Sequence, residues 1–170
     1  MISKAELKDV DAIASLVNSA YRGTYAKKGW TTEADMIDGT RTDAPALTDL
    51  LKRPDTTILK YERDGNIIGC VELKISDRRA YLGMLTVEPS IQGGGIGKEM
   101  LRAAEDFAKQ QNCTSVYMTV ITIRTELVDW YKRHGYVDTG ERKPFNFNDP
   151  RFGQPKQKLE FLVLEKQLQV

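Results

Sequence analysis

A glycine-rich turn between a strand-like segment and a helix-like segment constrains the fold of this chain more than any other feature. The stretch VEPSIQGGGIGKEM places three consecutive glycines and then Gly97 at the start of an apolar helical stripe. Glycines carry no Cβ, so a ligand can approach the backbone closely. The amide hydrogens that open the helix then favour a phosphate, through hydrogen bonds and the helix dipole. The turn therefore predicts a phosphate-binding loop, with a ligand-free helix cap as the alternative.

The spacing of the glycines excludes two common phosphate loops. A Walker loop ending at Gly97 and Lys98 would need glycine in place of Gln92 and Ser or Thr in place of Glu99. The dinucleotide fingerprint would need glycine or alanine at Lys98 or Met100, together with an early βαβ unit that the chain lacks. Neither a Walker nucleotide site nor a dinucleotide site is expected.

The order of the predicted elements indicates one α+β domain over residues 1–170. Alternating apolar and polar residues favour strands before the turn, and Asp64-Gly65 is a strong hairpin signal. After the turn, the pattern predicts a helix, a strand, a second helix that ends at Gly135, and two further strands. The expected strands are 2–5, 57–63, 67–76, 81–87, 116–120, 136–141 and 159–168, and the expected helices are 9–21, 44–52, 96–108 and 124–134. Residues 143–156 are expected to form a long loop.

Composition excludes several classes of function. The 25 basic and 24 acidic residues leave a net charge of +1, so the chain has no bulk field for nucleic acid or for an anionic membrane. No apolar run approaches the roughly 20 residues of a membrane span, and the charged start argues against a signal peptide. We therefore expect a cytoplasmic protein. One histidine, and two cysteines outside any CxxC spacing, predict no metal site and two core cysteines.

Two motifs together resemble those of a known family. Residues 92–97, QGGGIG, have the spacing Gln-x-x-Gly-x-Gly, and residues 130–136, WYKRHGY, have the spacing Tyr-x-x-x-Gly-aromatic. In these motifs the chain resembles the GNAT superfamily of acyl-CoA-dependent N-acyltransferases, and the match spans residues 81–140. The resemblance implies a mixed, mostly antiparallel sheet of about seven strands with helices on both faces. It also implies acetyl-CoA as cosubstrate and an acetyltransferase acting on a primary amine of a small molecule, amino acid or peptide by direct attack in a ternary complex.

The resemblance also implies which residues hold the cofactor. The strand before the turn would contact the pantetheine arm, and the amides of the turn would receive the pyrophosphate. The family commonly has asparagine seven residues before the motif tyrosine, whereas this chain has Arg124, which could reach a phosphate or pair with Glu126. The expected cofactor residues are Leu85, Thr86, Val87, Gln92, Gly93, Gly94, Gly95, Ile96, Gly97, Lys98 and Arg124.

Two residues are predicted to carry the chemistry. Tyr131 occupies the position of the family's general acid. A phenol pKa of ~10 lies above a thiol pKa of ~8.5, so full proton transfer is uphill by roughly 2 kcal/mol and a hydrogen bond to the thiolate is the better role. Glu72 is the predicted base, with Glu126 as a weaker choice. The alternatives are a packed aromatic for Tyr131 and a solvated surface residue for Glu72.

The acceptor is the least determined part of the prediction. The expected acceptor residues are Trp30, Glu33 and Tyr81. The surrounding segment 21–41 carries both carboxylates and basic residues, so it suits a cationic amine and an acidic substrate equally. A splay between residues 81–87 and 115–120 would admit the cofactor and could expose sheet edges to a homodimer. The competing functions are a non-catalytic acyl-CoA-binding or regulatory module on the same fold and a phosphate-binding domain without coenzyme A.

Overall fold

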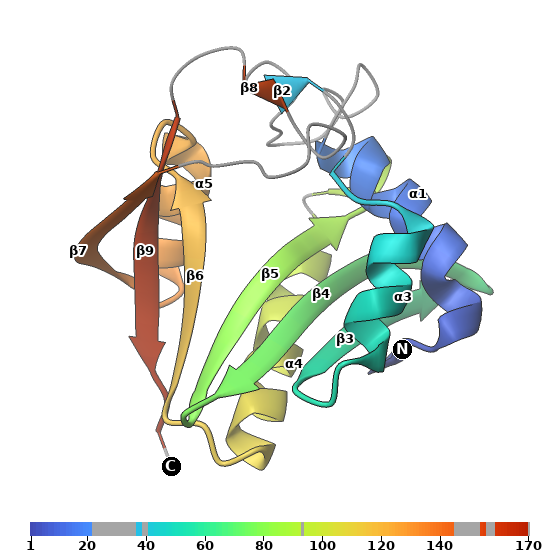
Figure 1. The fold of residues 1–170 in the computed structure, drawn as a ribbon, viewed down its shortest axis with the longest axis horizontal. Helices are drawn as coiled ribbons and strands as arrows, with labels where there is room; N and C mark the ends of the chain where they lie inside the picture. Colours follow the sequence, from blue (N-terminus) through green and yellow to red (C-terminus); the bar gives the residue numbers. More distant parts are fainter. Residues whose placement is uncertain (22–36, 39–40, 93, 145–153, 156–158, 170) are drawn as a thin grey trace.

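The computed structural model describes residues 1–21, 37–38, 41–92, 94–144, 154–155 and 159–169. In these residues, seven strands form one sheet in the order β1-β3-β4-β5-β6-β9-β7, with helices on both faces (Figure 1). Pairing is antiparallel except between β5 and β6. The predicted α+β class, the mixed and mostly antiparallel sheet and its seven strands are confirmed.

The elements follow the predicted order along the chain. The strands of the main sheet are β1 (Ile2–Lys4), β3 (Thr56–Arg63), β4 (Asn66–Ser76), β5 (Arg79–Val87), β6 (Ser115–Ile121), β7 (Val137–Pro144) and β9 (Glu160–Gln167). The helices are α1 (Val10–Tyr21), α3 (Ala44–Lys52), α4 (Ile96–Gln110) and α5 (Thr125–Arg133), with short 3₁₀ turns at Leu7–Asp9 and Pro89–Ile91. A separate two-stranded sheet pairs β2 (Ile37–Asp38) with β8 (Gln154–Pro155).

One strand is longer than its sequence pattern suggests. We expected residues 143–156 to be a loop, but β7 continues to Pro144 and pairs Lys143 with Phe161 of β9. The strand lies at the edge of the sheet, where a proline without an N–H is tolerated because that side of the strand needs no hydrogen bond. The loop prediction was therefore wrong for its first two residues, and also for Gln154–Pro155, which form β8.

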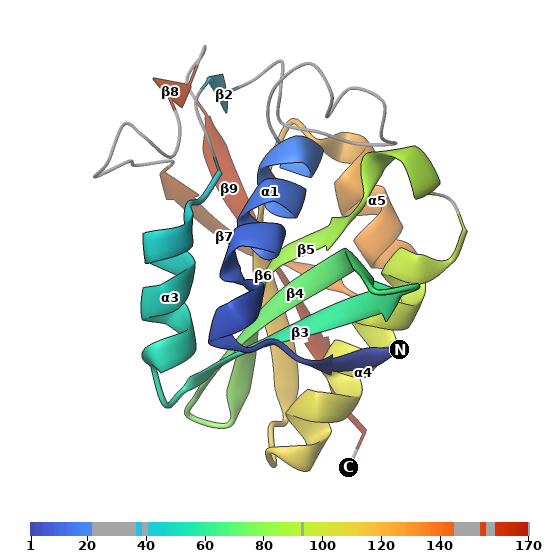
Figure 2. The same cartoon turned by 90° about the vertical axis from the view of Figure 1, so that its right-hand side faces the viewer.

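The helices bury two separate apolar clusters against the two faces of the sheet. The stripe of α1, with Ile13 and Val17 fully buried, packs with Leu47 of α3 against one face. The stripe of α4, with Met100 and Ala104 fully buried, packs against the other. Figure 2 shows α1 and α3 on one side of the sheet and α4 and α5 on the other. Each of these helices thus turns its apolar stripe toward the sheet.

Two expectations from composition can be compared with the described residues. Cys70 and Cys113 are buried and free, so they are core residues as predicted. No helix in the described ranges has both the length and the apolar character needed to cross a membrane.

The centre of the sheet opens where the parallel pair of β5 and β6 separates. The strands β5 and β6 pair over three positions, from Arg79 with Ser115 to Tyr81 with Tyr117. Both strands continue beyond this point but no longer pair with each other. From there to Ile121, β6 pairs with β9. Figure 1 shows β5 and β6 diverging toward the end of the sheet that carries the start of α5. The predicted splay is present, and beyond Tyr81 the edge of β5 that faces β6 no longer pairs with that strand.

Candidate active site

A bulge in β5 shapes one wall of a cavity. Between two of its pairs with β4, β5 contains one extra residue, and Met84 has a left-handed backbone with φ 51°. The bulge shifts the alternation of side chains by one residue, and Leu85, Thr86 and Val87, which follow it, all line the cavity. The Thr86 hydroxyl donates to the Met84 carbonyl at 2.8 Å, which holds the bulge in shape. The predicted pantetheine residues therefore lie together in one wall.

The glycine turn closes one end of the same cavity. The side-chain amide of Gln92 donates to the Val87 carbonyl at 3.0 Å and ties the turn to the end of β5. Gly95 is the N-cap of α4, with φ 84°, a conformation that glycine adopts at no steric cost. Because Gly95 has no side chain to cap the helix, the first amides of α4 remain available to an anion. Gly95, Gly97 and Lys98 all line the cavity.

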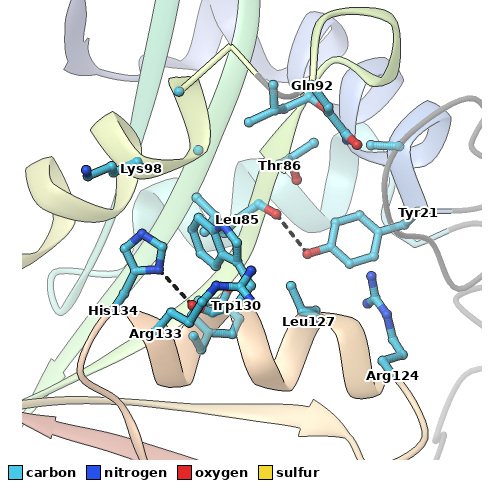
Figure 3. A pocket seen from close by; sticks show the side chains of 15 residues that line it. Tyr21, Leu85, Thr86, Gln92, Lys98, Arg124, Leu127, Trp130, Arg133 and His134 are labelled. Carbon is cyan, nitrogen blue, oxygen red and sulfur yellow. Dashed lines mark hydrogen bonds between the residues drawn. The ribbon is translucent and has the colours of Figure 1, made fainter.

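One face of α5 forms the opposite wall. Arg124, Leu127, Tyr131 and His134 recur at intervals of three and four residues, so they share a face, and all four line the cavity. Trp130 lies beside them, and its ring would be 3.7 Å from a Cβ built on Gly97, so α4 and α5 meet at this point. The walls enclose about 430 Å³. Figure 3 shows the side chains of α5 pointing toward Leu85 and Thr86.

The environment of Tyr131 keeps its phenol protonated. The side chain is only 5% exposed. Burial raises the pKa of Tyr131 far above its usual value, and the nearby Tyr21 adds to the rise. The positive charge of Arg124 acts in the opposite direction and lowers the pKa of Tyr131. Tyr131 can therefore donate a hydrogen bond at any ordinary pH but is a weak acid.

Tyr21 is a cavity residue that the sequence placed only at the start of the acceptor segment 21–41. Its hydroxyl donates to the Leu85 carbonyl at 3.1 Å, next to the bulge. The guanidinium carbons of Arg41 and Arg124 lie 5.5 Å and 5.7 Å from the centre of its ring. Tyr21 ends the apolar stripe of α1, so its sequence pattern is that of a core residue. Only the packing of α1 across β5 brings it to the cavity.

Basic side chains gather at the end of the cavity near α4. Lys98, Arg133 and His134 line this end, and Figure 3 shows His134 close to Lys98. His134 Nδ1 lies 2.7 Å from the Trp130 carbonyl and must donate to it, since a carbonyl only accepts. Sequence reasoning placed His134 only as a helix-terminal residue, and it did not identify Trp130 or Arg133. The spacing of three and four from Tyr131 is the signal that could have found His134 and Leu127.

The predicted base and one predicted acceptor residue lie outside the described lining of this cavity. Glu72 is paired with Gly83 across β4 and β5. A Cβ built on Gly83 would lie 3.3 Å from Glu72 Oε1 and 2.9 Å from the ring of Tyr81. The two side chains therefore meet over this glycine. The ring of Tyr81 also makes an edge-to-face contact with Tyr117 of β6, with 5.6 Å between centroids.

Burial sets the protonation of this second cluster. The pKa of the Glu72 carboxyl is raised by burial, and the positive charge of Arg41 opposes the rise. The pKa of Tyr81 is raised by burial as well, again opposed by Arg41. A carboxylate with a raised pKa is a better base near neutral pH than an exposed one. Glu72 therefore has the electrostatic environment of a base, although it lies apart from the cavity.

The remaining predicted residues fall into two groups. Trp30, Glu33 and Gly93 lie outside the described residues. The side chain of Ile96 is buried in the core, so only its backbone amide can serve a ligand, and Gly94 is exposed beside the turn. Within the described ranges, no three His, Cys, Asp or Glu side chains gather as metal ligands would.

Comparisons with known proteins support the resemblance seen in the sequence. The model of the Acetyltransferase (GNAT) family matches residues 11–136. An IAA acetyltransferase of Azospirillum brasilense is 26% identical over 56% of this chain, and an amino-acid acetyltransferase of Pseudomonas putida is 34% identical over 56%. The aligned stretches span 63% and 22% of those two relatives. The crystal structure of PaiA N-acetyltransferase from Thermoplasma acidophilum in complex with coenzyme A has a TM-score of 0.72, at 19% identity, over 99% of this chain and 98% of that one.

Proposed function

Because the chain belongs to the acetyltransferase (GNAT) family, we propose that it transfers an acetyl group from acetyl-CoA to a primary amine. The acceptor is a small molecule, an amino acid or a peptide, and the amine attacks the thioester directly in a ternary complex. The observation that carries the proposal is the cavity itself. It combines a strand segment that has separated from its parallel partner, a glycine-capped helix start and a buried tyrosine, each on a different element.

Successive parts of the cavity suit successive parts of coenzyme A. The amide-bearing pantetheine arm would lie along Leu85–Val87, because an extended backbone with open groups pairs with amides as a sheet edge does. The diphosphate would sit on the first amides of α4 beside Lys98, where hydrogen bonds, the helix dipole and a cation all favour it. The crystallised neighbour that holds coenzyme A supports an acyl-CoA as the donor.

The reaction assigns roles to residues around the thioester. The amine nitrogen forms a bond to the acetyl carbon, the carbon–sulfur bond breaks, and its electron pair stays on sulfur. A main-chain N–H near Leu85 would polarise the carbonyl oxygen. Tyr131 would donate a hydrogen bond to the sulfur, since its raised pKa disfavours full proton transfer. Glu72 would take the proton of the incoming ammonium, through water because it lies outside the cavity lining.

The amine acceptor is supported by the names of relatives and by the second cluster. The Pseudomonas putida relative is named an amino-acid acetyltransferase, and a Bacillus subtilis relative is named a putative ribosomal protein alanine N-acetyltransferase. In this chain Glu72 and Tyr81 offer a carboxylate and a hydroxyl to an amine on the face of the sheet that carries α1. The proposal assigns these two residues to the acceptor side.

The test is the release of free thiol from acetyl-CoA in the presence of a panel of amines. The panel contains free amino acids, polyamines and peptides with different N-terminal residues. The proposal expects acceptor-dependent release for at least one class, together with one acetylated product per thiol. Tight binding of acetyl-CoA with no release for any acceptor would instead favour a non-catalytic acyl-CoA-binding module and contradict the proposal.

A further inference from the structure

The side chains around Arg124 are not those expected if this residue contacts a phosphate. The resemblance implies asparagine at this position, where this chain has arginine. We propose that Arg124 holds its positive charge against the coenzyme A sulfur and stabilises the thiolate that leaves in acyl transfer. This inference rests on the proposed function, because it requires a coenzyme A thioester in the cavity.

The first argument is position. Arg124 is the N-cap of α5, lines the cavity and is only 4% exposed. Figure 3 shows it at the opposite end from Lys98 and His134, which surround the start of α4. A diphosphate held by the glycine turn therefore lies away from Arg124. The other end of the cofactor, which carries the thioester, is the part that Arg124 can meet.

The second argument is the set of groups that surround the guanidinium. Its carbon lies 5.7 Å from the centre of the Tyr21 ring. The hydroxyl of that ring donates to the Leu85 carbonyl, at the bulge where the thioester is expected. Arg124 and Tyr131 also share one face of α5 with Leu127 between them. The cation, the bulge and the predicted proton donor therefore surround one part of the cavity.

The third argument is chemical need. When the carbon–sulfur bond breaks, the electron pair leaves a thiolate in a partly buried site, and burying an unpaired charge is costly. Tyr131 is a poor proton source, because burial raises its pKa, with Tyr21 and Tyr81 adding to the rise and Arg124 opposing it. A guanidinium keeps its charge at every working pH. The acceptor ammonium loses one proton before it attacks and a second from its nitrogen as the amide forms. Glu72 takes the first proton through water and the solvent takes the second, so the thiolate can leave as an anion beside Arg124.

The experiment compares coenzyme A with desulfo-coenzyme A, which lacks the sulfur, by titration calorimetry between pH 7 and pH 9.5. A cation that lowers the bound thiol pKa by one unit gives an affinity gain of about tenfold over this range. We expect the affinity ratio of coenzyme A to desulfo-coenzyme A to rise by about tenfold or more in the unmodified protein. The ratio should stay flat in R124Q and in R124M, while R124K, which keeps the charge, should retain most of the rise.

The outcomes separate this inference from the proposed function. Binding of both ligands with the same pH dependence in the unmodified protein and in R124Q overturns the role of Arg124 and leaves the coenzyme A site standing. Equal weakening of both ligands by R124Q, at every pH, makes Arg124 a contact of the cofactor arm and also overturns its role at the sulfur. Binding of neither ligand to the unmodified protein overturns the proposed function and this inference together. Melting temperatures of the variants confirm that each titration uses folded protein.

Discussion

Substituting alanine at two glycines of the turn should change stability in opposite directions. Gly97 is the second residue of α4, where the backbone is helical and alanine is favoured over glycine by up to about 1 kcal/mol. A methyl group there would meet the Trp130 ring at 3.7 Å and Val87 at 3.8 Å, which is ordinary contact. Gly95 has φ 84°, which costs alanine about 1–2 kcal/mol although its Cβ meets no atom within 4 Å.

These free energies convert to measurable shifts. For a chain of this size, 1 kcal/mol moves the melting temperature by about 2–4 °C. We therefore expect Gly97→Ala to raise it by up to about 4 °C and Gly95→Ala to lower it by about 2–8 °C. Differential scanning calorimetry without ligand gives both values. The pair forms a matched control, since each variant adds the same methyl group two residues apart.

Affinity for coenzyme A should fall in the more stable variant. The methyl group at Gly97 lies between two cavity residues and keeps the diphosphate from the first turn of α4. Losing one charge-assisted hydrogen bond costs about 1.5–3 kcal/mol, which is about 10- to 100-fold in the dissociation constant. Titration calorimetry measures this dissociation constant. A Gly97→Ala protein that melts higher and binds coenzyme A as tightly as before would refute the reasoning, because the diphosphate then does not depend on close approach at this glycine.

Three further substitutions test the roles assigned to single side chains. Tyr131→Phe should keep the fold and the acetyl-CoA affinity but lower kcat by about tenfold or more, and an unchanged kcat removes Tyr131 from the chemistry. Glu72 has a raised pKa and acts as a base only when ionised, so kcat/KM should fall as pH drops through that pKa. The acidic limb should disappear in Glu72→Gln, and an unshifted limb excludes this residue. Tyr21→Phe removes the hydrogen bond to the Leu85 carbonyl and should lower the free energy of unfolding by about 1 kcal/mol, measured by urea denaturation; no change in stability would mean that water replaces the hydroxyl.

Local signals explain why so much of the fold could be predicted. The stripe of α4 from Ile96 to Ala108 and the hairpin at Asp64-Gly65 are set by neighbours in sequence, and both match the structure. The end of β7 could not be predicted in this way. Lys143 and Pro144 extend because β9, some 17 residues later, offers them a partner. Pairing with a distant strand overrides a local loop signal.

The site residues also divide into those with a local sequence signal and those placed by distant contacts. Gln92, Gly95, Gly97 and Tyr131 belong to the two motifs, and they line one cavity. Tyr21 carries no motif, because its role depends on a hydrogen bond to Leu85, 64 residues away. The bulge at Met84 could not be predicted from the sequence either. The backbone conformation of Met84, with φ 51°, is imposed by the pairing with β4 and is not one that a non-glycine residue prefers. Glu72 lies on β4, which pairs with the strand that leads into the turn, but strand alternation alone does not tell whether its side chain faces the cavity.

Binding of coenzyme A is the measurement on which the account depends most directly. Titration calorimetry of the unmodified protein with coenzyme A, and with ATP and NAD as comparators, decides whether the glycine turn and the β5 bulge hold this cofactor. The account predicts saturable heat at one coenzyme A per chain and much weaker heat for the two comparators. No heat with coenzyme A, or equal affinity for all three ligands, would contradict it.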